Sequence, residues 1–135
     1  MPPTPATNPT ILVVDDEPVV LNLTKLILET AGYPVLAANN GQQALAFFEN
    51  GNHSIDLLLT DINMPAISGL ELACRVSEIE PRLPVVFMTG RRTNGPGVEL
   101  LVDEGPFSHC KVIRKPFTSN ELLAEINGIL SASVG

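Results

Sequence analysis

Basic residues are scarce in this sequence, and their scarcity argues against several classes of partner. The 135-residue chain has eight Lys and Arg against fifteen Asp and Glu, which gives a formal net charge of −7. Nucleic acids and anionic membranes favour basic surfaces, so we expect the chain to bind neither of them non-specifically. Long apolar runs are missing as well. No stretch approaches the roughly 20 residues that a membrane-spanning helix needs, so we expect none.

Cysteine and histidine are also sparse. Cys74 and Cys110 have no CxxC spacing, and His53 and His109 form no cluster with them. We therefore expect no zinc site, two buried and reduced cysteines, and two histidines on the surface. The N-terminus lacks the basic start and the apolar run of a signal peptide, so the sequence predicts a cytoplasmic protein.

Short apolar runs alternate with longer helical patterns along residues 10–132, which we expect to form one domain. Residues 1–9 hold four prolines and are expected to be a tail or a linker. The apolar runs are continuous, as in strands that are buried on both faces. They fall at residues 11–14, 34–38, 55–59, 84–88 and, more weakly, 110–113.

Helical spacing links these runs. Val20, Leu23, Ile27 and Ala31 recur at helical intervals, and Gly32 ends the pattern. Strand and helix alternate five times, which predicts right-handed crossovers. The expected fold class is therefore α/β, with a doubly wound, five-stranded parallel sheet and helices on both faces.

The last helical pattern has a start signal and an apolar face. Thr118 and Glu121 have the spacing of a capping box. Leu122, Ile126 and Ile129 are expected to face inward from the helix that follows.

Acidic residues follow two of the predicted strands. Asp15 and Asp16 follow the first strand, and Asp61 follows the run "IDLLLT". Open α/β sheets bind ligands at the carboxyl ends of their strands, so these carboxylates are expected to converge. Three carboxylates raise one another's pKa unless a cation joins them, and Mg²⁺ prefers such oxygen ligands. The expected cofactor is therefore Mg²⁺.

A hydroxyl and an ammonium group are expected at the same edge of the sheet. Thr89 follows the fourth apolar run, and Lys115 follows the fifth. A carboxylate nucleophile, a divalent cation, a hydroxyl and a lysine together suit a phosphoryl group. A structural interpretation stays open for each residue taken alone. Asp15 and Asp16 could cap a helix that starts at Pro18, Thr89 could end a strand, and Lys115 could be solvated.

Four motifs occur in order between about Thr10 and Leu130: "LVVDDEP", "LLLTDINMPAISGLEL", "PVVFMTG" and "KPF". Each is weak alone, but four in order, each at the end of a predicted strand, are a specific signal. Together they resemble the receiver domain of two-component response regulators. The likeness is greatest to the receivers of hybrid histidine kinases. The resemblance implies the flavodoxin-like strand order 2-1-3-4-5.

The resemblance also implies roles for the residues of the expected site. Asp61 would be the phosphoacceptor, Thr89 the switch hydroxyl, and Lys115 the partner of the phosphoryl group. The peptide bond between Lys115 and Pro116 would be cis. The Mg²⁺ ligands would be Asp16, Asp61, the backbone carbonyl of Asn63 and, through water, Asp15.

Residues 90–114 depart from the family's pattern. Gly-Pro-Gly at 95–97 is a poor composition for a helix, and Val112 stands where the family usually has an aromatic residue. We hypothesise that the fourth helix is short or displaced. The coupling between Thr89 and the position of Val112 would then be weak.

The sequence thus predicts a phosphoacceptor receiver domain of a two-component system or phosphorelay. Asp61 would take a phosphoryl group from a histidine kinase or a histidine phosphotransfer domain, without turnover of an external substrate. Because the chain ends soon after its last helix, we expect a stand-alone regulator or a receiver cut from a larger protein. The oligomeric state stays open.

Two other classes of function stay open as alternatives. The first is an interaction module that works independently of phosphorylation, which the altered segment favours. The second is an aspartyl-phosphate hydrolase, which Asn63 disfavours because an amide cannot serve as an acid/base catalyst.

Overall fold

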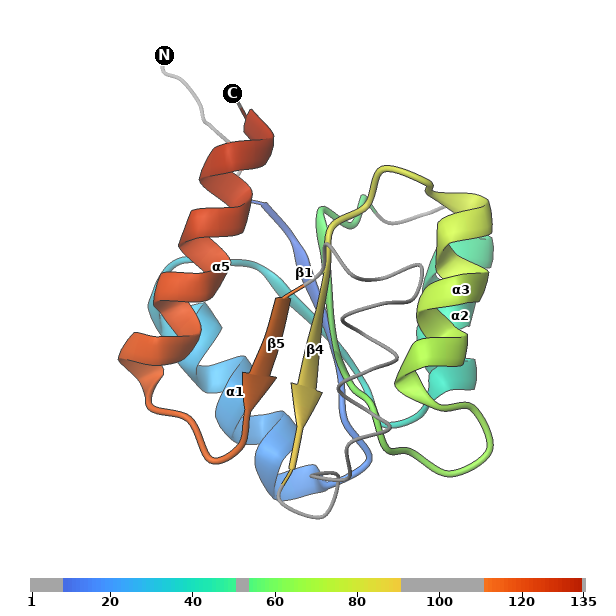
Figure 1. Cartoon of the computed structure of the whole chain (residues 1–135), viewed down its shortest axis with the longest axis horizontal. Coiled ribbons are helices and arrows are strands. Elements are labelled where there is room, and N and C mark those ends of the chain that lie inside the picture. The colour runs from blue at the N-terminus through green and yellow to red at the C-terminus, as the bar shows by residue number, and fades with distance from the viewer. Residues whose placement is uncertain (1–8, 51–53, 91–110, 135) are drawn as a thin grey trace.

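A five-stranded parallel sheet organises the chain (Figure 1). The computed structural model describes residues 9–50, 54–90 and 111–134, with side chains to residue 130. The strands are β1 (Ile11–Val14), β2 (Val35–Ala38), β3 (Leu57–Asp61), β4 (Val85–Thr89) and β5 (Lys111–Arg114). The helices described are α1 (Pro18–Thr30), α2 (Gly41–Asn50), α3 (Gly69–Ile79) and α5 (Ser119–Val134). The strand order is β2-β1-β3-β4-β5, which confirms the predicted fold class and order.

Helices cover both faces of the sheet. Helices α1 and α5 lie on one face, and α2 and α3 lie on the other (Figure 1). Successive strand residues point to opposite faces, so Leu12 and Val14 pack toward α2 and α3, while Ile11 and Val13 pack toward α1 and α5. All four residues of β1 are fully buried. The continuous apolar run at 11–14 therefore has the burial that its pattern predicts.

Helix α1 forms where expected, but none of the residues whose spacing predicted it is fully buried. Its buried side chains are Leu21, Thr24 and Leu28. Leu23, one of the residues whose spacing predicted the helix, is 51% exposed. Apolar residues occur on nearly every side of this helix, so their spacing predicts its existence better than its orientation.

The start of α5 confirms its predicted cap. The backbone N–H of Glu121 donates to the Thr118 hydroxyl at 3.1 Å, and the backbone N–H of Thr118 donates to the Glu121 carboxylate at 2.9 Å. Leu122 and Ile126 are fully buried, as predicted, and Ile129 is partly buried against the same core.

Strand β3 lies two residues further along the chain than predicted. It runs from Leu57 to Asp61 rather than over residues 55–59. Asp61 is thus the last residue of the strand, where it pairs with Met88 of β4, and not the first residue of a loop.

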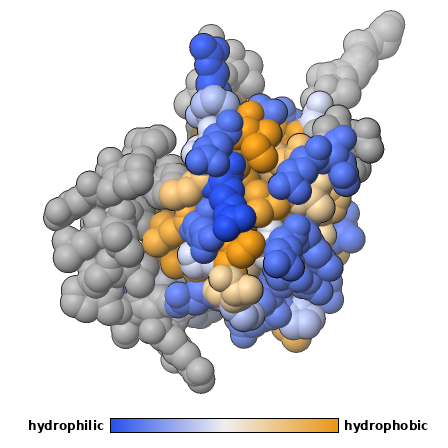
Figure 2. Space-filling view, turned by 90° about the vertical axis from the view of Figure 1, so that its right-hand side faces the viewer, coloured by the Kyte–Doolittle hydropathy of each residue, from blue (hydrophilic) through white to orange (hydrophobic). Residues whose placement is uncertain are grey.

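The α2–α3 side of the molecule presents hydrophilic residues with hydrophobic patches among them (Figure 2). On α3, Arg75 and Glu71 form an exposed ion pair at 2.8 Å. Cys74 is also exposed, so the prediction that it is buried was wrong. It lies on the outer face of α3, beside buried Ala73, where its side chain meets solvent rather than the core.

Several predictions fall outside the described residues. These concern the tail at 1–8, His53, His109, Cys110 and the fourth helix within 91–110. Among the helices that are described, none has both the length and the apolar character that crossing a membrane requires.

Candidate functional site

Polar residues gather where β1, β3, β4 and β5 end, at the lower edge of the sheet in Figure 1. Asp15 follows β1, Asp61 ends β3, Thr89 ends β4 and Lys115 follows β5. These strands are consecutive neighbours in the sheet, so the topology brings the four positions side by side. A pocket of about 670 Å³ opens there. Its lining is Asp16, Glu17, Val20, Leu23, Asp61, Asn63, Gly90, Lys115, Pro116 and Phe117.

Three carboxylates converge in this place. One carboxylate oxygen from each of Asp15, Asp16 and Asp61 lies within 4.8 Å of the other two. Asp15 is fully buried and Asp61 is 5% exposed, whereas Asp16 is half-buried and lines the pocket. An all-oxygen donor set open to a pocket fits Mg²⁺, which keeps several of its waters when it binds protein carboxylates.

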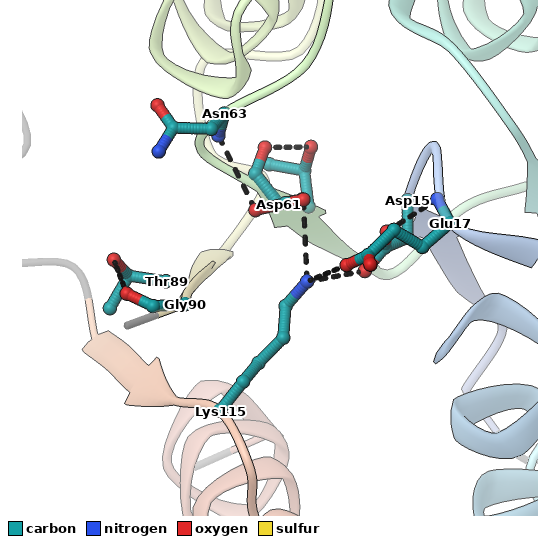
Figure 3. A network of polar contacts seen from close by, with 8 residues as sticks. Asp15, Glu17, Asp61, Asn63, Thr89, Gly90 and Lys115 are labelled. Carbon is teal, nitrogen blue, oxygen red and sulfur yellow. Dashed lines mark hydrogen bonds and ion pairs between the residues drawn. The ribbon is translucent and has the colours of Figure 1, made fainter. Parts of the chain in front are cut away.

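Lys115 lies at the centre of the cluster (Figure 3). Its Nζ donates to Asp15 Oδ2 at 2.8 Å and to Asp61 Oδ2 at 3.3 Å. A third carboxylate, that of Glu17, has its Oε1 at 3.6 Å from the same ammonium. The backbone N–H of Lys115 donates to the carbonyl of Thr89 at 2.8 Å, which fixes the start of the lysine against β4. The Lys115–Pro116 peptide bond is cis, as the resemblance implied.

Burial and charge shift the pKa values of the two central groups. Burial raises the pKa of Asp61 from 3.8 to about 6, because the positive charge of Lys115 only partly offsets the desolvation and the charge of Asp15 adds to it. Burial by itself would lower the pKa of Lys115. Its hydrogen bond to Asp15 and the charge of Asp61 outweigh that effect, and the pKa of Lys115 is raised. The ammonium therefore stays charged, while Asp61 binds a proton more readily than an ordinary aspartate.

The loop between β3 and α3 holds Asp61 in place. The backbone N–H of Asn63 donates to Asp61 Oδ1 at 3.3 Å, and the backbone N–H of Gly69 donates to the carbonyl of Ile62 at 2.8 Å. Ala66 has a φ of 68°, in the left-handed region, where the loop turns back. The hydroxyl of Thr60 donates to the backbone carbonyl of Asp61 at 3.0 Å. The loop thus closes tightly on the end of β3.

Thr89 lies at the same edge but is less directly engaged. It is 4% exposed, and its hydroxyl lies 3.5 Å from the carbonyl of Gly90 (Figure 3). Val112, on β5 opposite Phe87, is 39% exposed. The proposed coupling between these two positions stays a prediction, as do the metal-ligand role of Asp15, Asp16 and Asn63 and the phosphoacceptor role of Asp61.

Sequence reasoning missed Glu17. It is the third acid of the motif "DDEP", but the motif alone does not say whether the chain after β1 stays extended and so carries Glu17 to the same side as Asp15. Only the structure shows that its side chain turns toward Lys115 together with that of Asp15 (Figure 3).

A doubly wound sheet with carboxylates, a lysine and a threonine at its carboxyl edge defines an α/β domain with the kinds of side chain that a cation and a phosphoryl group require. The model of the response regulator receiver domain matches residues 11–127, and the chain belongs to that family.

Relatives of different lengths support this membership. The chain is 36% identical to the transcriptional regulatory protein TrcR of Mycobacterium tuberculosis, over 91% of its own length and 46% of that protein. It is 37% identical to the response regulator receiver protein CpdR of Brucella abortus, over 91% of its own length and 98% of that protein. The chain therefore spans about half the length of TrcR and nearly all of CpdR.

Solved structures have the same fold. A receiver domain protein of Clostridium thermocellum is 33% identical with a TM-score of 0.79, over 93% of this chain and 96% of that one. The receiver domain of the hybrid histidine kinase CckA is 28% identical, with a TM-score of 0.70, over 88% and 96%. Response regulator TrrA of Thermotoga maritima, in complex with Mg²⁺–BeF, is 31% identical with a TM-score of 0.73, over 89% and 97%.

Proposed function

We propose that this domain accepts a phosphoryl group on Asp61, in a Mg²⁺-dependent reaction, from a phosphohistidine of a histidine kinase or a histidine phosphotransfer domain. The observation that carries the proposal is the position of the Lys115 ammonium, 3.3 Å from Asp61 Oδ2, beside two further aspartates. Receiver domains are signal transducers, and we expect no turnover of an external substrate.

Asp61 is suited to be the nucleophile. One of its oxygens attacks phosphorus, the P–N bond of the phosphohistidine breaks, and that electron pair stays on the imidazole nitrogen. Asp61 becomes an acyl phosphate, and Lys115 exchanges its contact with Oδ2 for one with a phosphoryl oxygen. Mg²⁺, when bound, neutralises charge on the phosphoryl oxygens. Asp16 and Asp61 would hold it directly, with the Asn63 carbonyl, and Asp15 through water.

Two observations support the magnesium assignment. The donor set is three carboxylates within 4.8 Å of one another, without sulfur or imidazole. TrrA, at 31% identity, was solved in complex with Mg²⁺–BeF. Both observations favour a hard cation over zinc.

Acetyl phosphate and Mg²⁺ test the proposed function. We expect a mass increase of one phosphoryl group on wild-type protein, and none on Asp61→Asn, because an amide is not nucleophilic at phosphorus. Intact-protein mass spectrometry over time gives the result, with a chelator-treated sample as the control. Equal labelling of wild type and Asp61→Asn would contradict the assignment of Asp61.

The two aspartates after β1 should contribute unequally to Mg²⁺ binding. Asp16 lines the pocket, whereas Asp15 is fully buried and is hydrogen-bonded to Lys115. We expect Asp16→Ala to abolish measurable binding and Asp15→Ala only to weaken it. Calorimetric titration with Mg²⁺ measures both, and equal losses would show that the two roles are wrongly divided.

The mouth of the pocket suggests how a protein donor docks. Val20, Leu23 and Phe117 are apolar residues in the lining of the pocket. The exposed apolar side chains of Val19 and Leu26 continue the surface of α1 beyond it. A protein that brings a phosphohistidine to Asp61 must cover this mouth, so we propose that an apolar surface around that histidine packs on α1.

Leu23→Gln, which adds no charge to the pocket, tests this docking surface. Leu23 is half-exposed, so the substitution should leave the fold intact. We expect transfer from a phosphohistidine protein to fall about tenfold or more, the loss of roughly 1.4 kcal/mol or more at an interface. Labelling by acetyl phosphate should stay at the wild-type rate, because that donor needs no docking surface. Parallel loss with both donors would contradict the proposal.

A further inference from the structure

Glu17 reaches into the site from the start of α1. Its Oε1 lies 3.6 Å from the Lys115 ammonium, which also contacts Asp15 and Asp61. The side chain of Glu17 is 64% exposed, against 0% for Asp15 and 7% for Asp61. Of these three contacts, that of Glu17 is therefore the longest and the most exposed.

The backbone of Glu17 is held by hydrogen bonds, whereas its side chain does not cap the helix. Glu17 is the N-cap of α1, with φ −94° and ψ 113°, but its side chain makes no capping hydrogen bond. Its N–H donates to Asp15 Oδ1 at 2.9 Å, and its carbonyl accepts from the Leu21 N–H at 2.9 Å. Pro18 at the first helical turn removes one donor that a cap would satisfy. The carboxylate is thus free to extend across the pocket.

We infer that Glu17 is a positioning residue. Its carboxylate competes with the incoming phosphoryl group for the Lys115 ammonium and so slows phosphorylation of Asp61. This inference rests on the proposed function. A phosphoryl group at Asp61 brings negative charge and needs the same ammonium. The carboxylate of Glu17 must then leave Lys115 or lie beside another anion, and both cost free energy.

The same negative charge acts in the opposite direction on a cation. A carboxylate at the mouth favours Mg²⁺ in the pocket that it lines, and it disfavours a phosphoryl group there. Removal of the Glu17 charge should therefore weaken Mg²⁺ binding and strengthen the binding of phosphoryl. A purely structural role would not change the two affinities in opposite directions.

Glu17→Gln tests the inference, with Glu29→Gln as the matched control. Glu29 is an exposed residue near the other end of α1, away from the pocket. The two variants lose the same charge from the same helix. Three quantities are measured: the initial rate of labelling by acetyl phosphate at saturating Mg²⁺, the affinity for beryllofluoride followed by NMR, and the affinity for Mg²⁺ alone.

For Glu17→Gln we expect labelling and beryllofluoride affinity to rise about two- to fivefold, the equivalent of one partly exposed ion pair. Mg²⁺ affinity should fall, and Glu29→Gln should match wild type in all three. If acetyl phosphate labels Glu17→Gln at the wild-type rate or more slowly, with both proteins at saturating Mg²⁺, the inference is overturned. If wild-type protein takes no phosphoryl group at all, the proposed function itself fails.

Discussion

Replacing Gly69 by alanine is expected to destabilise the protein by about 3 kcal/mol or more. A Cβ at this position would lie 2.1 Å from the backbone carbonyl oxygen of Asp61 and 2.9 Å from the Cα of Ile62. These are backbone atoms at the end of a buried strand, so no side-chain rotation relieves the contact. Either α3 or the end of β3 must move, and the second movement displaces the candidate phosphoacceptor.

Gly128→Ala is the matched control for this substitution. Gly128 lies within α5, and a Cβ there would meet nothing within 4 Å. Alanine is the better helix former by about 1 kcal/mol, so Gly128→Ala should stabilise slightly. Urea unfolding of both variants measures the difference. Wild-type stability in Gly69→Ala would show that the loop shifts freely, and that Gly69 does not hold Asp61 in place.

Gly69→Ala should also weaken Mg²⁺ binding, because it displaces Asp61, which is one of the three converging carboxylates. Gly128→Ala should leave that affinity unchanged, since α5 contributes no carboxylate to the cluster. A stable Gly69→Ala protein with normal Mg²⁺ affinity would contradict both parts of the prediction.

Much of the fold could be predicted because the strands are continuous apolar runs. The sequence therefore predicted β1 to the residue, and the capping box marked the start of α5. The orientation of α1 could not be predicted in the same way. Leu23 and Leu28 are equally apolar, yet one is 51% exposed and the other fully buried. Which leucine faces the sheet depends on how the helix packs.

The candidate site could be located because parallel strands bring their carboxyl ends to one edge. Residues that end neighbouring strands, such as Asp61 and Thr89, must then lie close together. The partners of Lys115 could not be predicted, because they depend on side-chain conformations of residues that lie about 100 positions apart in the sequence. For the same reason Glu17 was missed: its proximity to Lys115 is a property of the pocket and of no local motif.

Asp61→Asn is expected to stabilise the metal-free protein at neutral pH. Burial raises the pKa of Asp61 from 3.8 to about 6, so the folded state binds the proton more tightly than the unfolded state. Stability due to this group is then full below about pH 4, is lost between about pH 4 and 6, and stays lost above. An asparagine carries no charge at any pH and so escapes this loss.

Urea unfolding in the presence of a chelator, at pH 4.5 and pH 7.5, measures the effect. The gain of Asp61→Asn over wild type should be larger at pH 7.5 than at pH 4.5 by about 2 kcal/mol. Glu49→Gln, which removes an exposed carboxylate from α2, should change stability by less than about 0.5 kcal/mol at both values. Equal gains of Asp61→Asn at the two pH values would show that ionised Asp61 is not destabilising.

Mg²⁺ should reverse the order of stability of the wild type and Asp61→Asn. A cation that binds only the folded wild type adds about 4.1 kcal/mol at 1,000 times its dissociation constant, more than the roughly 3 kcal/mol that ionised Asp61 costs at pH 7.5, whereas Asp61→Asn has lost one of the three carboxylates and gains less. The substitution that stabilises the chelated protein at pH 7.5 should therefore make it the less stable of the two at saturating Mg²⁺. Such a reversal would mean that the ionised carboxylate of Asp61 destabilises the metal-free fold, and that the bound cation removes this cost.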